Sequence, residues 1–353
     1  VPLGQRRICA LGRAHGPVGS RSPAPGAAPH LHEDPRTTQV RFDAPCPTSA
    51  VIACLGGMTA DRVYVVDKPL GLTSHDVVAR ARRLLGRRDV GHAGTLDPAA
   101  SGVLLLMTGE ALKLSGYLTS DSKRYRAVVR FGTATSTADA EGELTEQREL
   151  PPGWLTAERL APALDAERAR AAQLPPVYSA IKIAGQRAHR LARAGQSVPL
   201  EPRPVHVLSL ELVELGQNEV TVELHCSKGY YVRSLAVDLG EHLGVPSHLA
   251  ALRRLASGGF SLSEACTWPL QPESPFLTLE EATARCLGTV TVTEEGVQRA
   301  LCGKSLDASH FVELPGEDGI RGWLSGDGQL IALGALRSPG EWRVVRGIHR
   351  PQA

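Results

Sequence analysis

The chain carries, at residues 91–107, the stretch Gly91-His92-Ala93-Gly94-Thr95-Leu96-Asp97-Pro98-Ala99-Ala100-Ser101-Gly102-Val103-Leu104-Leu105-Leu106-Met107. Its second half is an apolar run that predicts a buried strand over 103–107. Pro98 restricts Asp97 to extended backbone, and the flanking glycines allow tight turns and close approach of a ligand. An acid held rigidly at the start of a core strand is a candidate nucleophile or base. An isolated Leu-Asp-Pro, by contrast, is usually a turn whose aspartate binds its own backbone.

The whole pattern resembles the catalytic motif of the TruB family of pseudouridine synthases. The Gly-His-x-Gly-Thr segment before Leu96-Asp97 is the most specific part. The resemblance runs from about Val63 to Thr267 and continues more weakly toward the C-terminus. It implies an isomerase that converts a T-loop uridine of tRNA, at position 55, into pseudouridine. It also implies that Asp97 is the essential carboxylate.

The amino-acid composition limits the classes of protein to which this chain can belong. The 353 residues are 42% hydrophobic, and no apolar run reaches the length of a membrane helix. The seven scattered cysteines form no zinc-like spacing, which predicts reduced thiols in a cytoplasmic protein. The formal net charge is only +2, so RNA binding has to come from local basic patches.

Residues 1–57 contain eight prolines and seven glycines without hydrophobic periodicity, which predicts a disordered extension. The first methionine is Met58. Our interpretation is that the native protein starts there and that the upstream stretch is an artefact of the gene model, with a genuine flexible tail as the alternative. We expect a catalytic domain over 58–270.

Hydrophobic patterning predicts an α+β fold with a mixed or antiparallel sheet flanked by helices. A capping box at Thr73–Asp76 starts one helix, and Tyr125 to Phe131 alternates as a strand should. The expected strands lie at 63–66, 103–107, 125–131, 205–214 and 220–226. The expected helices lie at 74–85, 156–172, 234–243, 247–256 and 279–286. Short β segments with glycine turns over 288–350 predict a small β-rich domain, for which the resemblance implies a PUA-like RNA-binding module.

The resemblance also assigns further site residues. Tyr125, in Lys-Arg-Tyr, is implied to stack on the target base near its C5 proton; a core tyrosine is the alternative. In the segment 226–234, Tyr231 is implied to line the base pocket and Arg233 to pair with Asp97. If this segment is extended, both side chains share one face. A surface arginine at a helix start is the alternative.

Three other residues match family positions. His92 is implied to lie against the flipped nucleotide, although a lone histidine is more often structural. Lys68 matches a lysine behind the active site, or else is a solvated turn lysine. Leu252 matches a pocket leucine and is compatible with a helix core as well.

A basic segment at about 179–203 coincides with an insertion that stand-alone family members use to grip the tRNA T-arm. Guide-RNA-dependent relatives largely lack this insertion. We expect it to contact the RNA backbone without reading sequence. The residues assigned to this role are Lys182, Arg187, Arg190 and Arg193.

The resulting hypothesis is a stand-alone, monomeric, cytoplasmic tRNA pseudouridine synthase that flips its target base and needs no metal, cofactor or obligatory protein partner. A guide-RNA-dependent synthase is the second hypothesis. A catalytically silent RNA-binding or RNA-folding protein is the third. A retaining glycosidase is remote, because no second positioned acid is suggested.

Overall fold

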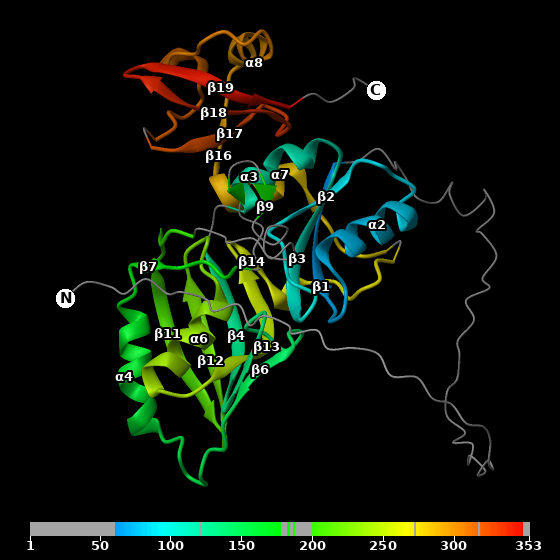
Figure 1. Ribbon diagram of the computed structural model, residues 1–353. Helices are drawn as coiled ribbons and strands as arrows, with labels where there is room; N and C mark the ends of the chain where they lie inside the picture. The colour runs from blue at the N-terminus through cyan, green and yellow to red at the C-terminus, as the bar shows by residue number, and fades with distance from the viewer. Residues whose placement is uncertain are drawn as a thin grey trace, which may run out of the picture. The chain divides into compact units, whose positions relative to one another are not determined.

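The computed structural model describes residues 61–119, 122–177, 182–183, 186–187, 200–271, 273–316 and 318–348. The expectation for residues 1–57 therefore lies outside the described residues. A nine-stranded sheet forms the larger part of the fold (Figure 1). Its path is β11-β12-β4-β13-β3-β1-β15, with β14 paired to β13 and β2 to β3. The strands are β1 Arg62–Lys68, β2 Val90–Ala93, β3 Ala100–Thr108, β4 Lys123–Phe131, β11 Val207–Leu215, β12 Glu219–Cys226, β13 Ser247–Ser257, β14 Phe260–Ser261 and β15 Leu277–Thr278.

The sheet is mixed. The β13–β3 pair is parallel, and the other strand pairs along the path are antiparallel. The expected mixed sheet is confirmed. β13 is a central strand, because β4 pairs along one edge and β3 along the other. Tyr125 lies on β4 and Leu252 on β13, and the loop before β3 carries Asp97.

Helices cover the sheet through their apolar faces. Helix α2, Ser74–Leu84, begins at Thr73 in the expected capping box with Asp76, and buries Val77, Val78 and Ala81 against β1 and β3. Helices α4, Ala157–Arg168, and α6, Val232–Leu243, pack in one core with β4, β11 and β12. Shorter helical elements are η1 Gly109–Leu114, α3 Ser115–Leu118, η2 Leu262–Glu264, α7 Leu279–Leu287 and η3 Ala308–His310.

Three two-stranded sheets lie outside the main sheet. Strands β5, Thr133–Thr135, and β6, Leu144–Gln147, form one of them. Strands β7, Ala172–Gln173, and β10, Arg203–Pro204, bracket the basic segment. Within it, β8, Lys182–Ile183, pairs with β9, Gln186–Arg187.

The helix expected over 247–256 is wrong, because this segment is strand β13. Its leucines at 249, 252 and 255 recur every three residues and so imitate a helical face. Two bulges let a strand carry this spacing, since the register shifts between Leu249 and Ala251 and again between Arg254 and Ala256. Pairing along both strand edges outweighs the helix propensity of the sequence.

The C-terminal region forms its own four-stranded sheet, β16-β17-β18-β19, with helix α8, Glu294–Leu301. The strands are β16 Thr289–Thr291, β17 Ile320–Leu324, β18 Leu330–Ser338 and β19 Glu341–Gly347. The fully buried Trp323 packs against Phe311 within the core of this region. Gly334 is required opposite it, because a Cβ there would lie 2.0 Å from the indole ring. The expected β-rich C-terminal region is confirmed.

Candidate active site

The loop between β2 and β3 carries Asp97. Ser74, the first residue of α2, fixes this loop. Its hydroxyl accepts a hydrogen bond from the Leu96 amide at 2.8 Å and donates one to the Leu96 carbonyl at 3.0 Å. The Ala100 amide donates to the Asp97 carbonyl at 3.0 Å, which closes the turn into β3. The Asp97 side chain is 48% exposed, so its carboxylate is held in place and accessible to a substrate.

Arg233 lies in the first turn of α6, with a side chain only 10% exposed. Its Nη2 is 3.2 Å from Asp97 Oδ2, so the two residues form the expected ion pair. The segment 226–234 is not extended along its whole length. β12 ends at Cys226, and Tyr231 is the N-cap residue of α6. The helix start directs the arginine inward because the preceding loop buries Tyr230 against α4, where its hydroxyl donates to Glu167.

Asp139 is a site residue that sequence reasoning missed. Its Oδ2 lies 3.6 Å from Arg233 Nη1, so the guanidinium bridges two carboxylates. Asp139 is buried in a tight turn in which Ala138 has a φ of 61°. The Thr137 hydroxyl and the Glu141 amide both donate to its Oδ1. No periodic pattern marks such a turn residue, which explains why the sequence did not reveal it.

A small cavity joins these groups to β13. Its lining includes Asp97, Asp139 and Arg233 from the charged side and Leu249 and Leu252 from the strand. Leu252 also packs against two of the apolar cores, but it does so from strand β13, so the alternative of a helix core is wrong. The site therefore combines a paired carboxylate with an apolar wall.

Lys68 ends β1 opposite Gly102 and is completely buried. Its Nζ donates to the carbonyls of Pro69 at 2.8 Å and Leu72 at 2.7 Å. Burial lowers the pKa of this lysine to about 8, against the opposing attraction of Asp97. The solvated-turn alternative is thus excluded, and the cation lies behind Asp97.

His92 is half-buried on β2, and its ring meets that of His75 edge to face, 5.3 Å between centroids. Burial lowers the pKa of His92, and the neighbouring His75 and Arg254 add to this effect. Its Nδ1 is buried and has no hydrogen-bond partner among the described residues. A neutral imidazole with one free ring nitrogen is available beside the Asp97 loop.

Tyr125 is half-buried on β4, directly across the ladder from Arg254 on β13. Burial raises the pKa of its phenol, while the charge of Arg254 acts in the opposite direction. Arg254 is 1% exposed and was not predicted as a site residue. The sequence Leu252-Arg253-Arg254-Leu255 gives no signal that separates it from its neighbour Arg253.

For the remaining expected residues the structure gives the backbone position or nothing at all. The backbone of Tyr231 is held by Gln173, whose side chain accepts from its amide at 2.8 Å and donates to its carbonyl at 3.1 Å. Lys182 and Arg187 are cross-strand partners in the β8–β9 hairpin. Arg190 and Arg193 lie outside the described residues.

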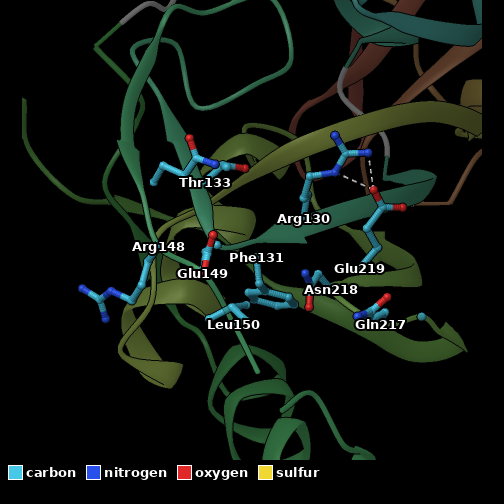
Figure 2. Close-up of a pocket in the computed structure, with 12 residues that line it drawn as sticks. Arg130, Phe131, Thr133, Arg148, Glu149, Leu150, Gln217, Asn218 and Glu219 are labelled. Atoms are coloured by element: carbon cyan, nitrogen blue, oxygen red, sulfur yellow. Dashed lines mark hydrogen bonds and ion pairs between the residues drawn. The ribbon is translucent and has the colours of Figure 1, made fainter. Parts of the chain in front are cut away.

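A second cavity, about 600 Å³, lies elsewhere. Figure 2 shows it between the end of β4 and the β11–β12 turn, where Arg130 pairs with Glu219 and Phe131 lies beside Leu150. None of its twelve lining residues belongs to the Asp97 cavity. We place the chemistry at Asp97, because an accessible carboxylate there meets a buried cation and acts electrostatically on Tyr125.

Three further observations concern the described part of the chain. No group of three or more His, Cys, Asp or Glu side chains within it is arranged to hold a metal ion. None of its helices combines the length and the apolar character that crossing a bilayer requires. Its four cysteines, at positions 226, 266, 286 and 302, form no disulfide with one another.

Comparison with solved structures agrees with the fold. A chain from a "Cbf5-Nop10-Gar1 Complex" matches with a TM-score of 0.60 at 23% identity, covering 78% of each chain. A chain from an "H/ACA RNP bound to a substrate RNA containing 2'-deoxyuridine" matches with a TM-score of 0.62 at 20% identity, covering 85% of this chain and 87% of that one. At these identities the likeness establishes the shared architecture.

Comparison of sequences is more specific. The family model described as "TruB family pseudouridylate synthase (N terminal domain)" matches residues 82–232. The protein named "tRNA pseudouridine synthase B" of Mycobacterium tuberculosis is 42% identical over 299 residues, which is 83% of this chain and 97% of the relative. That of Thermobifida fusca is 41% identical over 295 residues, 81% of this chain and 98% of the relative. With the Asp97 motif in a pseudouridine synthase fold, these matches establish that the chain belongs to the TruB family of pseudouridylate synthases.

Proposed function

We propose that this protein is a stand-alone tRNA pseudouridine synthase that isomerises the T-loop uridine at position 55. The observation that carries the proposal is the ion pair between Asp97 and Arg233, 3.2 Å apart at the entrance of a cavity with an apolar wall. The relatives named tRNA pseudouridine synthase B support tRNA as the substrate. The reaction makes the protein an isomerase.

The chemistry requires an exchange of bonds at one uridine. The bond between N1 of uracil and C1′ of ribose breaks, the base turns, and a bond between C5 and C1′ forms. The C5 proton is lost and N1 gains one, so no atom or electron is gained overall. Asp97 supplies the carboxylate, either as nucleophile or as base. Arg233 balances its charge and fixes its orientation by a charge-assisted contact.

The neighbouring side chains hold the detached base. Tyr125 stacks on it near its C5 proton, and Leu252 and Tyr231 line the pocket. His92 lies against the flipped nucleotide, and Lys68 supports the site from behind. Because the uridine has to leave its stack to reach Asp97, base flipping is part of the reaction.

RNA affinity comes from surfaces outside this pocket. The basic segment at 179–203 grips the T-arm through Lys182, Arg187, Arg190 and Arg193, and the region 288–350 acts as a PUA-like RNA-binding domain. We propose that residues 58–270 form the catalytic domain and that residues 1–57 are not needed. We further propose that the protein acts as a cytoplasmic monomer with no obligatory protein partner.

Tritium release from a tRNA transcript labelled at C5 of uridine, with no added RNA or protein, tests the proposal. We expect release by the parent chain and none by Asp97→Asn, which keeps the shape of the side chain but lacks the carboxylate. The variant should bind tRNA within a few-fold of the parent, because affinity comes mostly from backbone contacts.

Three outcomes separate the hypotheses. Turnover by Asp97→Asn near the parent rate removes Asp97 from the mechanism. Release only after a guide RNA is added identifies a guide-dependent enzyme. Tight tRNA binding without release by the parent chain identifies a silent RNA-binding protein.

A further inference from the structure

Arg254 is a buried cation without an acidic partner. It lies on β13, is 1% exposed, and forms no ion pair among the described residues, although its neighbour Arg253 pairs with Asp67 at 2.7 Å. Burying an unpaired charge is costly, so such a residue persists only where many hydrogen bonds compensate it. The partners of Arg254 indicate what it does.

The guanidinium connects three parts of the site. Its Nε donates to the Val103 carbonyl of β3 at 2.7 Å. Its Nη2 donates to the Gly94 carbonyl at 2.8 Å, and its Nη1 faces the Thr95 carbonyl at 3.4 Å, so it holds the loop that carries Asp97. Tyr125 lies directly across the ladder from it on β4, and the charge of Arg254 acts on the pKa of the phenol.

We propose that Arg254 is a positioning residue that sets Tyr125 and the Asp97 loop relative to each other. A guanidinium has only donors. In this role the Tyr125 hydroxyl oxygen accepts from it, and the phenolic hydrogen points away from Arg254. One rigid group thus fixes the loop of the reactive carboxylate and the hydroxyl orientation of the stacking tyrosine. This inference rests on the proposed pseudouridine synthase activity.

Two glycines lie close to Arg254, one beside its guanidinium and one beside its backbone. A Cβ at Gly94, where φ is 77°, would lie 3.5 Å from Arg254 Nη1. A Cβ at Gly102 would lie 2.2 Å from the Arg254 carbonyl oxygen. Lysine cannot replace the arginine, because a single ammonium lacks the planar fork that reaches several acceptors at once.

Kinetics of Arg254→Lys, Tyr125→Phe and the double variant test the proposal. Parent turnover is measured first, so that a failure of the proposed function is recognised separately. In single-turnover reactions at saturating tRNA we expect Arg254→Lys to lose at least about 30-fold in rate, with tRNA affinity within about threefold. The control Arg253→Lys should keep both the single-turnover rate and the tRNA affinity within about threefold of the parent values.

Coupling distinguishes positioning from general support of the fold. In the Tyr125→Phe background we expect the loss in single-turnover rate caused by Arg254→Lys to be at least about fivefold smaller than in the parent. Part of its effect acts through the hydroxyl, which this background lacks. Equal losses in both backgrounds, an Arg254→Lys rate within threefold of the parent, or a loss confined to tRNA affinity would overturn the inference.

A second measurement keeps Arg254 in place, in case Arg254→Lys does not fold. Tyr125→Phe removes the acceptor oxygen and leaves the ring. We expect amide hydrogen exchange over residues 91–100 to speed up by at least about threefold, since the guanidinium loses one of its anchors. Unchanged exchange there would contradict the link between Tyr125 and the Asp97 loop.

Discussion

Replacing Lys68 by methionine tests the electrostatics of the site. The substitution keeps an unbranched side chain and removes the charge that is buried behind Asp97. It also removes the two hydrogen bonds to the Pro69 and Leu72 carbonyls. Those bonds are lost equally at every pH, so a pH-dependent difference in stability between the two chains reports on the charge alone.

The magnitude follows from the lowered pKa of Lys68, which is about 8 in the folded protein against an ordinary value of 10.5. Each unit of pKa corresponds to about 1.36 kcal/mol, so this difference in pKa corresponds to roughly 3 kcal/mol in the free energy of unfolding. Between pH 8 and pH 10.5 the unfolded chain holds the lysine proton more tightly than the folded chain. Raising the pH through this window therefore stabilises the folded protein.

Urea denaturation at pH 7.5 and pH 10 measures the effect. We expect the free energy of unfolding of the parent, relative to Lys68→Met, to increase by roughly 2 kcal/mol between these two pH values. Lys228→Met is the control, because Lys228 is exposed after β12. It should show no such change. The same difference between parent and Lys68→Met at both pH values would refute the reasoning.

Two further predictions concern the reaction and the RNA. Arg233→Ala leaves Asp97 without its partner, so pseudouridine formation at saturating T-arm RNA should fall by at least about 100-fold while binding changes only a few-fold. A rate near that of the parent, with an unchanged thermal melt, would argue against the pair. Joint replacement of three arginines of the basic segment by alanine should raise KM, lower the slope of log affinity against log salt by roughly 2 to 3, and leave single-turnover chemistry unchanged. An unaltered slope would exclude phosphate contacts there. The three arginines are Arg187, Arg190 and Arg193.

Local patterns were sufficient for most of the fold. The capping box at Thr73, the alternation in Tyr125–Phe131 and the apolar run at 103–107 each specify an element through its own residues. The segment 247–257 is different. Its leucine spacing is accommodated in a strand through two bulges, which are defined only by its pairing with β4. No property of the segment alone distinguishes this strand from a helix.

The same distinction applies to the site. Asp97 and Arg233 stand in dense motifs, and their contact was anticipated, although the backbone at 226–234 is a loop and a helix start rather than an extended segment. Asp139 and Arg254 act through contacts between segments far apart in the chain. A turn aspartate and one of two adjacent arginines carry no local sign of burial, so the fold is needed to identify them.

The central place of β13 has a consequence for synthesis on the ribosome. β3 ends at Thr108 and β13 begins at Ser247, yet β13 is the strand that joins β3 to β4. At about 5–20 residues per second, the intervening chain takes on the order of ten seconds to make. During that interval the facing edges of β3 and β4 have no partner, and long-range pairing of this kind is slow to form. The nascent chain therefore has to keep two strand edges from pairing wrongly until Ser257 has emerged, and the catalytic groups come together only then.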